Sequence, residues 1–88
     1  MKVENITSNN GNKIANQFIV NDDNGNTYFQ SYNSMIVKLN GDRVELDQKY
    51  WNYSNTTGKY RNIFLNETIK DTRAKIKNGT YILTDLNK

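Results

Sequence analysis

The stretch that decides the fold is Tyr50–Leu65, which reads Tyr-Trp-Asn-Tyr-Ser-Asn-Thr-Thr-Gly-Lys-Tyr-Arg-Asn-Ile-Phe-Leu. It holds the only Trp of the chain, three of the six Tyr and one of the three Phe. Apolar runs typical of strands precede this stretch, and a helix-like run and one more strand follow it. We therefore expect the functional surface here.

Length, charge and residue types exclude several classes of protein before any motif is considered. The chain has 88 residues and a net charge of +3, which fits one small domain and excludes a mimic of DNA, because such a protein would be acidic. The absence of Cys and His excludes thiolate metal sites and removes the commonest general base. No apolar run is long enough to span a bilayer and no signal peptide is recognised, so we expect a cytoplasmic protein.

Two Asn-Gly pairs predict hairpins on the N-terminal side of the stretch. Around Asn24-Gly25, a two-residue turn would place Val20 opposite Phe29 on one face of the sheet. Around Asn40-Gly41, the same turn collects apolar residues on one face and leaves Ile36 and charged residues on the other. The predicted apolar face of this second hairpin consists of Met35, Val37, Leu39, Val44 and Leu46.

Helical signals follow. Residues Lys59–Leu65 could form a short helix with Tyr60, Ile63 and Phe64 on one side, and Ser54–Thr57 offers N-cap residues. Thr68 and Asp71 resemble a capping box for a helix that runs to about Lys77, with Ile69, Arg73 and Ile76 inward and Asn78-Gly79 as its C-cap. Thr80–Asp85 has the composition of a closing strand.

These elements predict an α+β fold. We expect an antiparallel β-meander of about 4–5 strands, covered on one face by one or two short helices, with a C-terminal strand that rejoins the sheet. Residues 15–88 are expected to form the single domain. Residues 1–14 lack regular apolar spacing, so they are expected to be a flexible arm or an edge strand.

Catalytic constellations are weak. Glu45 and Asp47 share a face of a strand and could bind Mg²⁺ or act as acid and base, but the polar face of an amphipathic strand with Lys38 or Arg43 beside Glu45 explains them as well. No Gly-rich phosphate loop and no nucleophile–base pair can be assembled. We expect a protein that is not an enzyme and has no cofactor or metal.

Recognition is the remaining candidate. Aromatic rings interleaved with cations resemble a stacking platform for bases, and the same residue types are enriched in protein–protein hot spots. The alternative is that the larger rings belong to the core. The candidate partner-binding residues are Tyr50, Trp51, Tyr53, Lys59, Tyr60 and Arg61.

Five segments together resemble a family of small proteins carried by phages and mobile elements of low-GC Gram-positive bacteria. They are Tyr28–Ile36, Leu46-Asp47, Tyr50–Ser54, Thr56–Asn62 and Phe64-Leu65, and the resemblance extends over residues 15–88. No catalytic or binding residues come with it.

This setting implies an accessory protein that binds and sterically blocks a host protein or ribonucleoprotein, with an anti-CRISPR inhibitor as the main hypothesis. One alternative is a phage protein that binds single-stranded nucleic acid through the aromatics with Lys38, Arg43, Lys59 and Arg61. Another is an oligomeric structural or assembly protein.

Overall fold

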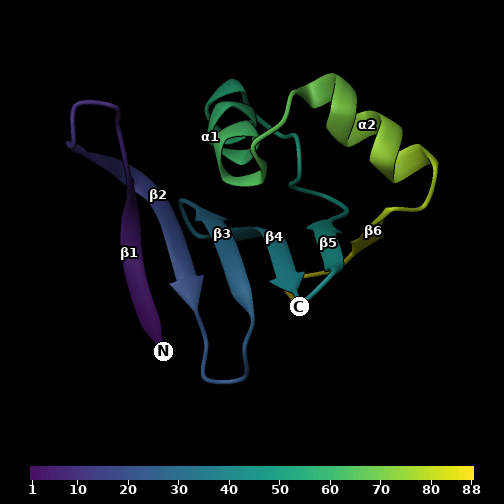
Figure 1. Ribbon diagram of the computed structural model, residues 1–88, viewed down its shortest axis with the longest axis horizontal. Helices are drawn as coiled ribbons and strands as arrows, with labels where there is room; N and C mark the ends of the chain where they lie inside the picture. The colour runs from purple at the N-terminus through teal and green to yellow at the C-terminus, as the bar shows by residue number, and fades with distance from the viewer.

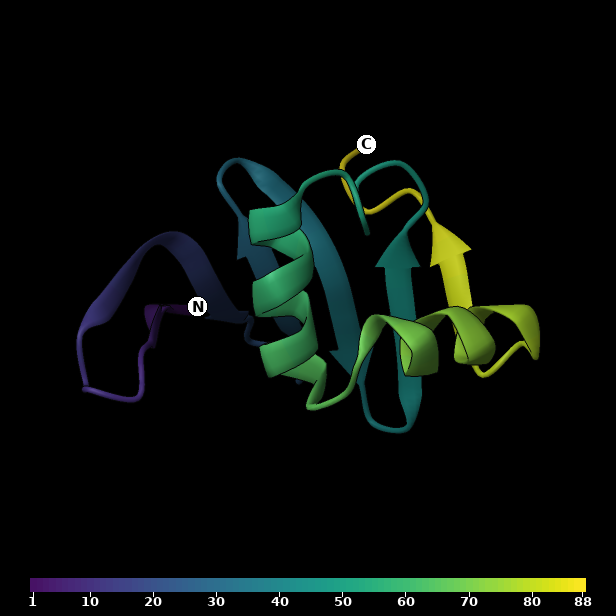
Figure 2. The same cartoon turned by 90° about the horizontal axis from the view of Figure 1, so that it is seen from above.

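The computed structural model describes residues 1–88 as one six-stranded sheet with two helices on one face (Figures 1 and 2). The fold is α+β, as the sequence predicted. Strands follow the chain order across the sheet, so β1 and β6 form its two edges. The elements are β1 Lys2–Thr7, β2 Lys13–Asn21, β3 Thr27–Ser31, β4 Ser34–Asn40, β5 Arg43–Asp47, α1 Asn55–Leu65, α2 Ile69–Lys77 and β6 Tyr81–Thr84.

The direction of β6 separates it from the meander. Neighbours from β1 to β5 pair antiparallel, whereas β5 and β6 are parallel, with Leu46 opposite Leu83. A parallel pair needs a crossover, and here α1 and α2 supply it. Because β6 runs parallel to β5, the chain must return from the end of β5 to the level where β5 starts. Helices α1 and α2 make this return, and they therefore lie across one face of the sheet.

The predicted register of the first hairpin is wrong by one residue. Val20 lies opposite Tyr28, and Ile19 lies opposite Phe29. The cause is the loop, because the Asp22 carboxylate accepts hydrogen bonds from the backbone N–H of Asn24 and Asn26 and holds a longer turn than Asn24-Gly25 alone. A shift of one residue exchanges the faces, so Phe29 shares its face with Ile19 and not with Val20.

The second hairpin shifts by two residues, which preserves its faces. Leu39 lies opposite Val44 and Val37 opposite Leu46, so these four residues share a face as predicted. The placement of Met35 and Ile36 was wrong. The β3–β4 pairing is irregular after Phe29, and Ile36 is fully buried while Met35 is half-buried. An extra residue in β4 turns Ile36 towards the core.

Helix α1 is longer than predicted. It begins at Asn55, and its N-cap Ser54 accepts a hydrogen bond from the Thr57 backbone N–H at 3.1 Å. Gly58 is therefore inside the helix and not before it. The side of α1 that faces the sheet also differs from the prediction, because Ile63, predicted to be inward, is 54% exposed.

Helix α2 follows the prediction in its boundaries and caps. Thr68 and Asp71 form the reciprocal hydrogen bonds of a capping box, and Asn78 is the C-cap. Glu67 joins this helix to β6. Its carboxylate accepts hydrogen bonds from the Lys75 ammonium at 2.7 Å, the Tyr81 hydroxyl at 2.6 Å and the Thr72 hydroxyl at 2.6 Å.

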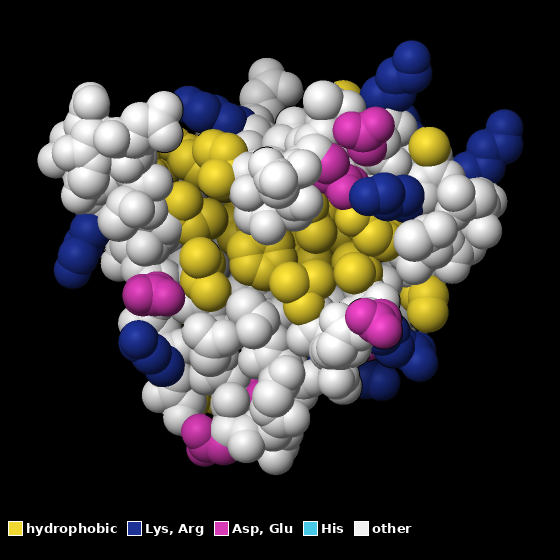
Figure 3. Space-filling model, viewed as in Figure 1, with side chains coloured by type: hydrophobic (Ala, Val, Ile, Leu, Met, Phe, Trp, Pro, Cys, Tyr) yellow, Lys and Arg dark blue, Asp and Glu magenta, His cyan; other side chains and the backbone are white.

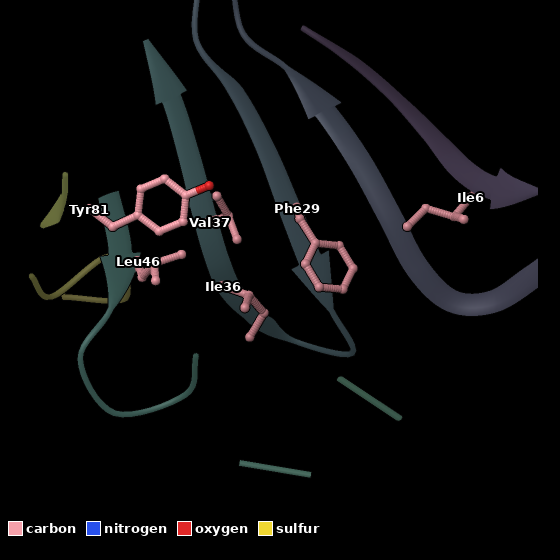
Figure 4. Packing of buried hydrophobic residues seen from close by; sticks show 6 residues of the cluster. All are labelled: Ile6, Phe29, Ile36, Val37, Leu46 and Tyr81. Carbon is pink, nitrogen blue, oxygen red and sulfur yellow. The ribbon is translucent and has the colours of Figure 1, made fainter. Parts of the chain in front are cut away.

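The core lies between the sheet and the helices and is small (Figure 4). Only 14 of the 88 residues are buried. Phe64 of α1 stacks on Phe29 of β3, with ring centroids 5.7 Å apart. Many apolar side chains around this core are only half-covered. No helix is long and apolar enough to cross a membrane. The six residues of the central cluster are Ile6, Phe29, Ile36, Val37, Leu46 and Tyr81.

Candidate functional site

Arg61, predicted as a partner-binding cation, is in the interior and 1% exposed. Its guanidinium donates to the Trp51 carbonyl oxygen at 2.8 Å, to Asn52 Oδ1 at 3.0 Å and to Asn62 Oδ1 at 2.9 Å. Burial lowers the pKa of Arg61, and the nearby charge of Arg73 lowers it further. Arg61 therefore fixes the loop before α1 through hydrogen bonds, and its guanidinium is not available to a partner.

Trp51 lies between the two helices. The Arg61 guanidinium of α1 is 5.3 Å from its ring centroid, and the Arg73 guanidinium of α2 is 5.7 Å from it. The ring is half-buried and packs against the core. Such cation–π contacts stabilise partly desolvated sites, so the main role of Trp51 is to hold α1 and α2 together.

The Ser/Thr cluster of this stretch also has a structural role. Thr57 is fully buried, and its hydroxyl lies 2.9 Å from the Ser31 hydroxyl of β3 and accepts from the Ser54 hydroxyl at 3.0 Å. At the next residue, the Cβ that Gly58 lacks would lie 3.5 Å from Asn52 Oδ1. The contacts of the segment Trp51–Arg61 thus hold α1 against the sheet, and we call this segment the clasp.

Tyr50 and Tyr53 lie in the loop before α1. Their rings meet edge to face at 5.4 Å, and the Lys49 ammonium is 5.3 Å from the Tyr50 centroid. Tyr53 is 45% exposed, whereas Tyr50 packs partly against the core. The buried Asp47 carboxylate accepts hydrogen bonds from the backbone N–H of Tyr50 and Lys49 and fixes this loop.

Lys59 and Tyr60 occupy the other side of α1. The Lys59 ammonium is 5.4 Å from the Tyr60 ring centroid. Both line an open groove of about 290 Å³ between α1 and the loop that joins β1 to β2. Figure 3 shows hydrophobic side chains gathered beside this loop and continuing below α1. The residues of the groove are Thr7, Ser8, Asn9, Ile14, Lys59, Tyr60 and Ile63.

The carboxylate pair of β5 is explained by local contacts. The Glu45 carboxylate lies 3.8 Å from the Lys38 ammonium and 3.6 Å from Arg43 Nε. This agrees with the interpretation of Glu45 as part of the polar face of an amphipathic strand. Burial alone would raise the pKa of Asp47, but hydrogen bonds from the backbone N–H of Leu86, Tyr50 and Lys49 outweigh it and lower the pKa. No group of three or more acidic, His or Cys residues is placed to hold a metal ion.

The sequence missed two parts of the groove. Ile63 was assigned to the buried side because of its spacing with Tyr60 and Phe64. In the structure the inward side is formed by Thr57 and Arg61, which are buried, and by Phe64, which stacks on Phe29, and Ile63 faces outward. The contribution of the β1–β2 loop had no signal in the sequence, because only the pairing of distant strands brings Thr7–Asn9 to α1.

Comparisons with known proteins give a family but no activity. No curated protein and no solved structure matches the chain. The model of a family of unknown function, DUF8033, matches residues 1–80. This match covers most of the sequence, and the chain therefore belongs to the DUF8033 family.

Proposed function

We propose that this protein acts by binding a partner protein through an apolar surface on the helix side of the sheet. The observation that supports this most directly is the band of hydrophobic side chains in Figure 3, rimmed by charged residues. Large apolar patches with polar rims are typical of interaction sites. The groove contributes Ile14, Tyr60 and Ile63 to this apolar band. On the same side of the sheet, further apolar side chains that pack against the core stay partly exposed, namely Ile19, Leu39, Val44, Phe64 and Leu65.

The charge of the groove favours a partner with acidic residues around an apolar centre. Neither segment that lines it, 7–14 or 59–63, contains Asp or Glu. Lys59 is exposed at its wall. Complementary charges at the rim of an interface favour association and orientation.

The positions of the cations favour a protein over single-stranded nucleic acid. Lys38 and Arg43 are paired with Glu45 on the sheet face that the helices leave open, and Arg61 is buried. Of the four cations considered for binding single-stranded nucleic acid, only Lys59 lies in the groove. A site for single strands needs a groove of cations that follows the backbone.

The specific role that we put forward is a cytoplasmic inhibitor of a host defence system, of the anti-CRISPR type. It would act without chemistry of its own, by covering a surface that its target needs. Small size, the apolar band and the phage setting inferred from sequence support this role. The protein's target would be a host protein or a ribonucleoprotein.

A pull-down with two matched variants tests the proposal. Tagged protein is incubated with lysate of a Gram-positive host, with and without nuclease. Ile63→Asp places a charge in the apolar band, and Val3→Asp places one at an equally exposed position outside it, since Ile63 is 54% and Val3 57% exposed. We expect a stoichiometric host protein with wild type and Val3→Asp, resistant to nuclease and lost with Ile63→Asp.

Two results would contradict binding through this surface: capture that Ile63→Asp leaves unchanged, and recovery of nucleic acid alone. For the inhibitor role, the purified chain is added to an activity assay of the captured target. Wild type should reduce that activity and Ile63→Asp should not. If the target binds fully but its activity does not change, the proposal of a protein partner stands and the proposed inhibitor role is wrong.

A further inference from the structure

The two edges of the sheet differ in how they are protected against further strand pairing. β1 carries Lys2 and Glu4, and charges on an edge strand oppose addition of another strand. β6 has no charged residue, no Pro and no irregularity in its pairing with β5. Its Ile82 and Leu83 lie on opposite faces and are 39% and 41% exposed. β6 is short, but otherwise its edge is open to pairing.

The free backbone groups of this edge belong to Tyr81 and Leu83. The Thr84 carbonyl oxygen accepts a hydrogen bond from the Gln48 backbone N–H at 2.8 Å, so Thr84 points towards the β5 side, and Ile82 with it. Alternate residues of a strand direct their N–H and C=O groups to opposite sides. Tyr81 and Leu83 therefore direct theirs outward, where a seventh strand would lie.

Helix α2 overhangs this edge. Figures 1 and 2 both show the last turn of α2 extending past β6. A strand added to β6 would therefore lie below the end of this helix. After Asp71 the helix has no carboxylate. Lys77 in its last turn is exposed, whereas the Arg73 guanidinium lies over Trp51 and Lys75 is bonded to Glu67. A ligand with acidic side chains is therefore the one that fits below the last turn of α2.

We infer that β6 is a strand-addition site for an extended segment of a partner protein in which apolar residues alternate with Asp or Glu. The outward groups of Tyr81 and Leu83 bind its backbone. Its apolar side chains cover Ile82, and its carboxylates face Lys77. This site is at the other end of the sheet from the groove, so it goes beyond the proposed function and uses different residues.

Amide hydrogen exchange of the full-length chain tests this site, with a blocked hexapeptide of alternating Val and Glu as the probe. Pairing through so few hydrogen bonds predicts a dissociation constant on the order of 1 mM. Above that concentration, we expect the Tyr81 and Leu83 amides to exchange about fivefold more slowly. The amides of β1 should not change, and neither should any amide with a control peptide of alternating Val and Lys.

Two variants separate this site from the groove. Leu83→Glu adds a carboxylate at an exposed edge position, on the face where Leu83 lies opposite Leu46 and where the carboxylates of the probe would lie. The repulsion should abolish the slowing, with little change in the urea midpoint of unfolding. Ile63→Asp should retain it. Unchanged exchange with the Val–Glu peptide, or equal slowing with the Val–Lys peptide, would overturn the inference. Slowing that rises with protein concentration alone would assign β6 to a second copy of this chain instead.

Discussion

Two sides of helix α1 carry similar residue types but have different roles. On the inner side, Arg61 is 1% exposed, and its guanidinium donates hydrogen bonds to the loop before α1 and to its own helix. On the outer side, Lys59 and Ile63 are exposed along a groove. A cation beside an aromatic ring occurs on both sides, as Arg61 with Trp51 and Lys59 with Tyr60. The pairing itself therefore does not indicate a binding site.

Burial decides between the two roles. Trp51 and Tyr60 are both half-buried, so the cations make the difference. Arg61 is buried, so its interactions stabilise the fold. Lys59 is exposed, so its contact with Tyr60 contributes little to stability and its ammonium stays free for a partner. Substitutions at positions only two residues apart should therefore separate stability from binding.

The largest effect is expected for Arg61→Met, which keeps the length of the side chain and removes its hydrogen bonds. Leaving the buried oxygens of the clasp without a donor should lower the free energy of unfolding by about 3 kcal/mol. Urea unfolding followed by the fluorescence of Trp51 measures the change. Lys59→Met, the matched control on the outer side, should cost less than about 0.5 kcal/mol. Equal effects of the two variants would contradict the comparison.

Asp47→Asn should have the next largest effect, because the Asp47 carboxylate fixes the loop that Arg61 clasps. Loss of charge-assisted hydrogen bonds should cost about 2 kcal/mol at neutral pH. Since the folded state lowers the pKa of Asp47, its contribution is present above the unfolded pKa and is lost as pH falls through the folded value. Wild-type stability should drop below about pH 4, and the difference from Asp47→Asn should shrink there.

Glu67 adds to the same acid dependence. Burial alone would raise the pKa of Glu67, but hydrogen bonds from Lys75, Thr72 and Tyr81 lower it. Asp22 and Asp71 also have a lowered pKa, so the pH series should be repeated with Asp47→Asn and with the double variant Asp47→Asn/Glu67→Gln. The part of the remaining acid transition that the second substitution removes is assigned to Glu67. A profile that the second substitution leaves unchanged would contradict a lowered pKa for Glu67.

Gly58→Ala is expected to stabilise the protein, by about 0.5–1 kcal/mol, because Ala favours helix more than Gly. The added methyl would meet Asn52 Oδ1 at 3.5 Å and the Arg61 guanidinium at 3.7 Å, which are ordinary contacts. The urea midpoint measures this change. Destabilisation instead would mean that the clasp has no room for one methyl group.

The smallest effect on stability is expected on the outer side. Ile63→Asp should change the free energy of unfolding by less than about 0.5 kcal/mol, since the side chain is 54% exposed. Its effect on partner capture should be the largest of the set. Thermal unfolding of the purified variant, run beside the pull-down, checks that lost capture is not lost folding.

Local signals predicted those parts of the fold that depend on neighbouring residues. The cap of α2 by Thr68 and Asp71 was confirmed because both partners lie within one turn. In the second hairpin the shared face of Val37, Leu39, Val44 and Leu46 was confirmed, because a shift of two residues preserves it. The bulge that places Ile36 in the core was not predicted. The first hairpin was wrong because Asp22 holds a longer turn than the Asn-Gly pair suggested.

The sequence by itself determined the α+β class, the shared face of Val37, Leu39, Val44 and Leu46 and the location of both helices along the chain, since these follow from local spacing and capping. Only the tertiary structure decided which of the predicted site residues stay accessible. Arg61 and Lys59 are indistinguishable as cations in sequence, but the phase of α1 and the return of the chain to β6 place one against Trp51 and the other in the groove. Burial is a property of all the packed layers together, and no short stretch of sequence contains it.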